Sequence, residues 1–183
     1  MCTSVNCSVK LLIPNKDIEY WANRYDYPLS ETNLINQKPH IEKQGYLTKN
    51  ILEELCMWKS RRSAGYMKRN SEEYINEITQ ISFQSTNERI KIEILTMLDG
   101  VGWPTASVIL HLFATDKYPI LDFRALWSVN TENAEYNFDF WWEYVLFTRL
   151  LSERHNIDMR TLDRALWQYS KEKQQIQDSI AKE

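Results

Sequence analysis

Gly100 and Gly102 lie two residues apart in a chain that has only four glycines, and their spacing is the first sign of chemistry. Apolar residues recur at helical spacing over 87–98 before them and over 104–114 after them. The pattern predicts a helix, a tight turn and a second helix, because glycine accepts a positive φ and Pro104 suits the first turn of a helix. That second helix would begin with backbone N–H groups that lack an acceptor within the helix, and such groups bind anions.

An aspartate follows this turn at a distance that also suggests chemistry. The segment 118–126 reads Tyr-Pro-Ile-Leu-Asp-Phe-Arg-Ala-Leu, and Asp122 lies twenty residues after Gly102. A short helix is expected over 123–129, so Asp122 is in position to cap it. Backbone N–H groups that donate to the carboxylate would keep it ionised. The cap and a chemical role are therefore compatible.

The two signals together resemble a known group of proteins. Residues 98–102 resemble the hairpin of helix-hairpin-helix DNA-binding proteins, which typically reads Leu-Pro-Gly-Val-Gly; here Asp99 replaces the proline. With the spaced Asp122, the chain resembles the helix-hairpin-helix superfamily of base-excision DNA glycosylases. The resemblance is close over 71–129. In the rest of the chain it extends only to the number and size of the helices. Residues 118–127 with 161–167 look like a distinct bacterial branch of undefined activity, one that lacks the lyase lysine.

The resemblance implies roles for particular residues. The hairpin would hold one DNA phosphate on the 3′ side of the damaged base through Gly100, Val101, Gly102, Trp103 and Thr105. No cofactor would be required, but an Na⁺ or K⁺ ion could be held by the main-chain oxygens of Thr96, Leu98 and Val101. Asp122 would stabilise the oxocarbenium-like sugar as the glycosidic bond breaks, or activate water. Pro104 stands where strand-cutting members carry a lysine, so the implied enzyme is a monofunctional glycosylase without AP lyase activity.

A cationic segment at 58–69 has no acidic residue, and its twelve residues include the cations Lys59, Arg61, Arg62, Lys68 and Arg69. Cationic side chains interleaved with aromatic ones suit phosphate neutralisation combined with base stacking. The alternative is a solvated helix face whose charge is balanced by the glutamates at 53, 54, 72 and 73. Arg124 is a further phosphate candidate, or forms a surface salt bridge with Asp122.

Chemistry on a base requires that the base leave the stack and enter an aromatic-lined pocket. The candidates to line such a pocket are Trp58, Tyr66, Trp103, Phe123, Trp127, Trp141 and Trp142. Aromatic residues in helices usually belong to the core, which is the alternative for each of them. The adjacent Trp141 and Trp142 point in two directions on a helix, so at least one is expected to face away from the main core.

Composition narrows the function classes. The 183 residues carry a net charge of −3, which argues against a general nucleic-acid coat. It leaves room for a local cationic site, because salt screens distant charges beyond about 10 Å. No apolar run approaches the roughly 20 residues of a membrane span, and no signal peptide is evident, so a cytoplasmic protein without a membrane partner is expected.

The metal-binding residue types are sparse. Cys2, Cys7 and Cys56 cannot form the four-cysteine iron–sulfur cluster of some relatives, and they lack the Cys-x-x-Cys spacing of a zinc site. The three histidines are scattered, so no catalytic metal is expected.

No stretch alternates apolar and polar residues with a period of two, so the expected fold is all-α, and the resemblance implies the helix-hairpin-helix glycosylase fold. A single domain is expected over 1–183. Its parts are a six-helix-type core at 48–130 with the hairpin at 98–106, a flanking lobe at 17–28 and 138–173, and loose ends at 1–16 and 174–183.

Capping residues predict where several helices begin. Thr48, Ser71 and Asp158 each precede an apolar helical pattern, and Ser85 with Glu88 matches a capping box. Residues 29–46 contain Pro39, Gly45 and many polar residues and predict a long loop, in which a short helix could lie.

Three functions remain open from the sequence. The first is a monofunctional DNA glycosylase that removes a damaged or modified base. The second is a non-catalytic DNA-binding module of a repair or phage-defence system. The third is a helical protein–protein adaptor that kept the scaffold and lost DNA binding.

Overall fold

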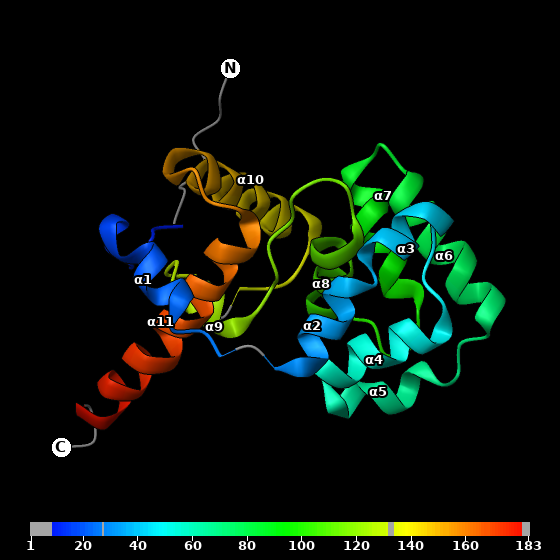
Figure 1. Cartoon of the computed structure of the whole chain (residues 1–183), viewed down its shortest axis with the longest axis horizontal. Coiled ribbons are helices and arrows are strands. Elements are labelled where there is room, and N and C mark those ends of the chain that lie inside the picture. Colours follow the sequence, from blue (N-terminus) through cyan, green and yellow to red (C-terminus); the bar gives the residue numbers. More distant parts are fainter. Residues whose placement is uncertain (1–8, 27, 132–133, 181–183) are drawn as a thin grey trace. The chain divides into compact units, whose positions relative to one another are not determined.

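The computed structural model describes residues 9–26, 28–131 and 134–180 and, within them, all side chains except those of 61, 63, 64 and 175–180. Every regular element in these ranges is a helix, which confirms the all-α prediction. None of the described helices has the length and apolar character that crossing a membrane requires. In chain order (Figure 1) the elements are η1 (Asn15–Asp17), α1 (Ile18–Asn23), α2 (Leu29–Asn36), α3 (Lys38–Gln44), α4 (Lys49–Lys59), α5 (Arg61–Met67), α6 (Glu72–Gln84), α7 (Glu88–Glu93), η2 (Ile94–Met97), α8 (Trp103–Phe113), α9 (Phe123–Trp127), α10 (Phe138–His155) and α11 (Met159–Ile180).

The described residues divide into two compact units. Unit 1 comprises those within Met1–Tyr25, Asp122–Glu135 and Phe140–Glu183, and unit 2 comprises those within Asp26–Leu121 and Tyr136–Asp139. The boundary at Leu121 and Asp122 cuts through the expected 48–130 core, and residues 28–47 belong with the hairpin in unit 2.

Unit 2 is built around α8. Almost every residue of α8 is buried, as a helix that is apolar on all sides requires. Helices α3, α4 and α7 pack against it, and α2 packs on α4 (Figure 1). The predicted start of α4 is confirmed, because the Thr48 side chain accepts the N–H of Ile51 at 3.5 Å. Leu52 and Leu55 of α4 are fully buried.

Unit 1 is organised by α11, on which α1 and α9 pack (Figure 1). The segment before η1 is held by backbone hydrogen bonds, since Lys10 N donates to Val129 O and Leu12 N to Ser128 O, each at 2.9 Å. Val9 and Ile13 are buried. The apolar run 9–13 of the expected loose end is therefore docked within unit 1, and residues 1–8 lie outside the described part of the chain.

Three further predictions of local structure need correction. Residues 29–46 are not a loop but contain α2 and α3. Asn87, not Ser85, caps α7, because its side chain accepts the N–H groups of Arg89 and Ile90, at 3.0 and 3.3 Å. The final helix continues to Ile180 instead of ending near 173. The starts of α6 at Ser71 and α11 at Asp158 are confirmed, since each side chain accepts an N–H three residues on.

Candidate functional site

The two glycines of the hairpin have different backbone conformations. Gly100 has a φ of +83°, the left-handed region that a side chain disfavours, and it allows Val101 N to donate to Leu98 O at 3.0 Å. Gly102 is extended, with φ −95° and ψ 179°, and any residue adopts that conformation. A Cβ built on Gly102 would have its nearest contact with Pro104 Cδ at 3.9 Å, an ordinary distance. The fold itself thus needs a glycine at 100 but not at 102.

The start of α8 is open. Gly102 is the N-cap and has no side chain to accept the first N–H groups. The first bond of the helix runs from Ala106 N to Gly102 O at 2.9 Å, which leaves the N–H groups of Trp103 and Thr105 without an acceptor in the helix. Gly102 is exposed and Trp103 half-buried, whereas Val101 and Thr105 are buried. Gly102 and Trp103 are therefore the accessible residues of this part of the predicted phosphate site.

The hairpin is held in place by a buried side chain that the sequence analysis did not identify. Asn70, only 4% exposed, accepts the N–H of Asp99 and donates to Asp99 O, both at 3.0 Å. Its Nδ2 also donates to Met67 O, at 2.9 Å. Only the position of Asn70 one residue before the helix cap Ser71 could have drawn attention to it.

Asn70 also connects the hairpin with the end of the cationic segment. Lys68 and Arg69 precede Asn70 directly and are exposed. The Arg69 guanidinium lies over the Tyr66 ring at 5.0 Å, and that ring is 53% exposed. Arg62 is exposed on α5, while the side chain of Arg61 lies outside the described residues. The predicted phosphate-binding residues Arg62, Lys68 and Arg69 and the predicted stacking residue Tyr66 are therefore exposed in the same unit as the hairpin.

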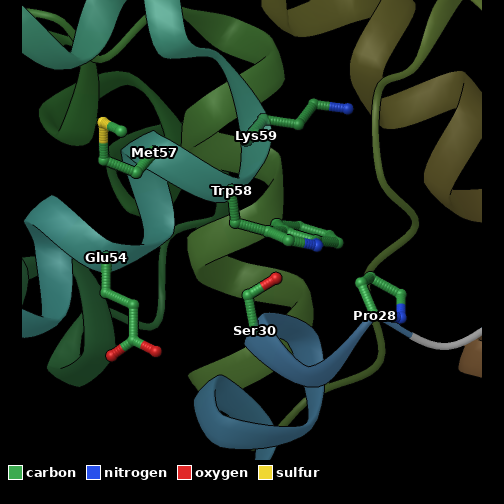
Figure 2. Close-up of a pocket in the computed structure, with 6 residues that line it drawn as sticks. All are labelled: Pro28, Ser30, Glu54, Met57, Trp58 and Lys59. Carbon is green, nitrogen blue, oxygen red and sulfur yellow. The ribbon is translucent and has the colours of Figure 1, made fainter.

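Two other predicted residues, Trp58 and Lys59, end α4 and line a pocket of about 530 Å³ (Figure 2). Its other lining residues are Pro28, Ser30, Glu54 and Met57. Pro28 and Ser30 come from the cap and first turn of α2, a segment for which the sequence predicted a loop. The structure thus groups Trp58 and Lys59 with α2 in this pocket, which no hairpin residue lines.

Asp122 begins α9 in unit 1. Its Oδ1 accepts the N–H of Arg124 at 3.0 Å, so the predicted cap is present, and the residue is half-buried. The preceding residue, Leu121, donates its N–H to Ser107 Oγ at 2.8 Å, and the same hydroxyl donates to Pro104 O at 2.8 Å. Ser107 is fully buried, so it fixes the backbone one residue before Asp122 to the first turns of α8.

Arg124, two residues after Asp122, lies against aromatic rings of unit 1. The Arg124 guanidinium lies 5.0 Å from the Phe123 ring and 5.5 Å from the Trp167 ring. The Lys171 ammonium lies 5.0 Å from the same Trp167 ring, and Phe123 is 61% exposed. Sequence reasoning identified Phe123 and Arg124 but missed Trp167 and Lys171, although their spacing of four residues on a helix was a readable signal.

The remaining pocket candidates have different surroundings. Trp141 is fully buried and Trp127 is 7% exposed, so neither presents a ring to the surface. The Trp127 and Tyr169 rings are 6.0 Å apart, which places Trp127 in the packing of unit 1. Trp142 is half-buried, and the Arg149 guanidinium lies 5.5 Å from its ring. The core alternative therefore fits Trp127 and Trp141.

Among the described residues no group of three His, Cys, Asp or Glu side chains is arranged to hold a metal ion. At the hairpin, Leu98 O accepts one N–H and keeps a second lone pair, so the predicted main-chain site for Na⁺ or K⁺ on Thr96, Leu98 and Val101 remains chemically reasonable. Burial, with the charge of Glu53, raises the pKa of the Cys56 thiol to about 12, so this cysteine is a poor nucleophile.

Comparisons with known proteins gave no match to a protein-family model, to a curated protein or to a solved structure.

Proposed function

We propose that this chain binds DNA through its hairpin and removes a damaged or modified base as a monofunctional DNA glycosylase. The observation that carries the proposal is the open start of α8. Gly102 is exposed and the Trp103 N–H has no acceptor within the helix, so this start suits a phosphate oxygen, and the positive end of the helix favours its charge. A glycine at 102 that the fold does not need is what close approach of an outside group would require.

The cations of unit 2 support a nucleic acid as the source of that phosphate. Lys68 and Arg69 lie next to Asn70, which is bonded to the hairpin at Asp99. Several neighbouring cations can neutralise successive phosphates of one strand, and Tyr66 offers an exposed ring for stacking. The net charge of −3 confines this attraction to a local surface.

Asp122 supplies the chemistry in this proposal. The hydrogen bond from Arg124 N fixes the orientation of the Asp122 carboxylate. A fixed negative charge near C1′ stabilises the positive sugar that forms as the N-glycosidic bond breaks, and a carboxylate can also orient the attacking water. Pro104 carries no amine, so no Schiff base forms at this position and the sugar–phosphate backbone stays uncut.

Base release from duplex DNA tests the proposal. Duplexes carrying alkylated, deaminated or hypermodified bases are incubated with the full chain, and free base is measured by chromatography. We expect release by the wild type and a rate about 100-fold or more lower in Asp122→Asn. Asparagine is also a good N-cap, so the fold is retained. Asp158→Asn makes the same change at the cap of α11, where Oδ1 accepts Thr161 N at 2.9 Å, and serves as the matched control.

Equal rates in wild type and Asp122→Asn would refute the catalytic role. The cap on α9 then becomes the whole role of Asp122, and this bond is the observation that favours the second candidate, a non-catalytic DNA-binding module. That candidate predicts salt-sensitive DNA binding and no base release. If the double variant Gly100→Ala, Gly102→Ala binds DNA as the wild type does, the hairpin has no DNA role and a protein–protein adaptor is favoured.

A further inference from the structure

The pocket at the end of α4, called here the Trp58 pocket, combines an aromatic face with polar groups of three kinds. Its volume of about 530 Å³ is within the roughly 300–1,000 Å³ usual for small-molecule sites. Figure 2 shows the Trp58 indole extended from α4 with Ser30 on one side and Lys59 on the other. All its lining residues belong to unit 2.

The apolar part of the pocket suits a flat ring. Trp58 is half-buried and presents a broad π-face, and the Pro28 ring lies beyond its tip in Figure 2. Met57 also lines the pocket and adds an apolar side chain to its wall. Indole faces stack well on planar heterocycles, and electron-poor rings gain most.

The polar groups of the pocket could contact two different parts of one ligand, an amino group and an anion. Glu54 lies one helical turn before Trp58, so the two side chains share a face of α4. Its carboxylate only accepts hydrogen bonds, which matches the amino group of a base. The Ser30 hydroxyl points toward the indole and can donate or accept (Figure 2). The Lys59 ammonium extends on the opposite side and matches an anion, such as a phosphate.

We infer that the Trp58 pocket binds one nucleotide, with the base stacked on Trp58, an amino group of the base on Glu54 and the phosphate at Lys59. The choice of a nucleotide rests on the proposed function, whereas the pocket and its chemistry do not. A base with an exocyclic amino group fits better than thymine, because only such a base donates an amino N–H to the carboxylate.

Calorimetric titration of the full chain with free nucleotides tests this inference. The probes are the four deoxynucleoside 5′-monophosphates and the corresponding nucleosides. We expect dAMP, dCMP and dGMP to bind more tightly than dTMP, and each monophosphate more tightly than its nucleoside. Trp58→Leu should weaken binding roughly 5- to 150-fold, the range reported for loss of one base–aromatic stack, and Trp58→Phe should restore part of it.

The two polar contacts have separate signatures. Lys59→Gln should abolish the preference for monophosphates over nucleosides, whereas Lys43→Gln, an exposed lysine of α3, should keep it. Glu54→Gln should reduce the preference over dTMP, because the glutamine amide can also donate to a thymine carbonyl, whereas Glu77→Gln, an exposed glutamate of α6, should keep it. A single-stranded oligonucleotide that displaces dAMP would identify the ligand as part of a DNA strand, and failure to displace it would identify a free nucleotide.

Absence of nucleotide binding at millimolar concentration would overturn the inference, as would binding that Trp58→Leu, Trp58→Phe and Lys59→Gln all leave unchanged. Base release without free-nucleotide binding would reject this pocket and retain the glycosylase. Nucleotide binding without base release would retain the pocket and reject the glycosylase.

Discussion

The N-termini of α8 and α9 differ in whether a side chain accepts the first backbone N–H groups of the helix. The start of α8, in unit 2, has Gly102 as its N-cap, and no side chain accepts its first N–H groups. The start of α9, in unit 1, has Asp122, whose carboxylate accepts the N–H of Arg124. The open start can receive an anion from outside, whereas the occupied start fixes an anion of the protein itself. Under the proposed function, similar local structure thus binds a ligand in one place and positions a charged group in the other.

Placing a carboxylate at the N-terminus of α8 should have the largest effect, and the quantity affected is the affinity for duplex DNA. Gly102→Asp puts a carboxylate where the phosphate is expected, and like charges a few ångströms apart should weaken duplex binding about 100-fold at low salt. The extended backbone at Gly102 accepts the new residue without strain. Fluorescence anisotropy with a labelled duplex measures the affinity.

Gly102→Asn is the neutral control, because asparagine also caps a helix. It should weaken binding by less than Gly102→Asp, and the difference should shrink as salt is added. Equal affinities for the three proteins would mean that the α8 start does not meet DNA.

The hairpin glycines should differ in their effect on stability. Gly100→Ala forces a side chain into φ +83° and should lower the free energy of unfolding by about 1–2 kcal/mol. Gly102→Ser should change it by less than about 0.5 kcal/mol, because an extended φ suits serine and serine caps well. Urea denaturation measures both. A larger loss at 102 than at 100 would contradict the separation of structural and binding roles.

Removing the side chain that caps α9 should lower the free energy of unfolding only through loss of the cap. Asp122→Ala should lower the free energy of unfolding by about 1 kcal/mol, since the N–H of Arg124 loses its acceptor. Asp122→Asn retains an acceptor and should lower it by less than half as much. If the two variants were equally destabilised, the carboxylate would stabilise the fold through its charge and not through the cap.

The smallest expected effect is on the free energy of unfolding at high pH. It concerns the hydrogen bonds that join Glu88 and Lys91 of α7 to Asp116 and Tyr118. Burial raises the pKa of Tyr118 to about 12, and its hydroxyl donates to Glu88 at 2.7 Å. Burial alone would lower the pKa of Lys91, but hydrogen bonds with Asp116 and Tyr118 raise it above its ordinary value. Both groups keep their protons more firmly when folded, so their contribution is complete below about pH 10 and is lost as pH rises above that value.

We therefore expect the free energy of unfolding to fall from about pH 10 upward, and to fall less steeply in Tyr118→Phe. Denaturation at a series of pH values measures the slope. The same slope in both proteins would show that the pKa of Tyr118 does not differ between the folded and unfolded states. This network provides a stability reference in unit 2 that does not involve the hairpin.

The sequence predicted features that depend on near neighbours. Thr48, Ser71 and Asp158 were identified as caps because each acts within three residues. The same local rules were misapplied at 38–45, where Pro39 and Gly45 suggested a loop. Pro39 lies in the first turn of α3, and Gly45, with φ +84°, ends it. These residues were the start and stop signals of a helix.

Features that join distant segments could not be read in this way. Asn70 contacts Asp99 across 29 residues, and nothing in the spacing of the chain indicates that pairing. The i, i+4 spacing of Glu54 and Trp58 can be read from the sequence. The position of Ser30 in the same pocket cannot, because it depends on how α2 packs on α4. The open start of α8 was predicted because Gly100, Gly102 and Pro104 lie close together in the sequence.

Asn70 also has a consequence for local motion. Asp99 is an exposed hairpin residue, yet its N–H is bonded to a side chain that is 4% exposed and fastened to Met67 at the end of α5. Fraying of the hairpin alone would break the two hydrogen bonds that the buried Asn70 amide makes with Asp99, so we expect the hairpin to open together with the α5–α6 junction. Hydrogen exchange at this surface amide would then be as slow as exchange in the interior.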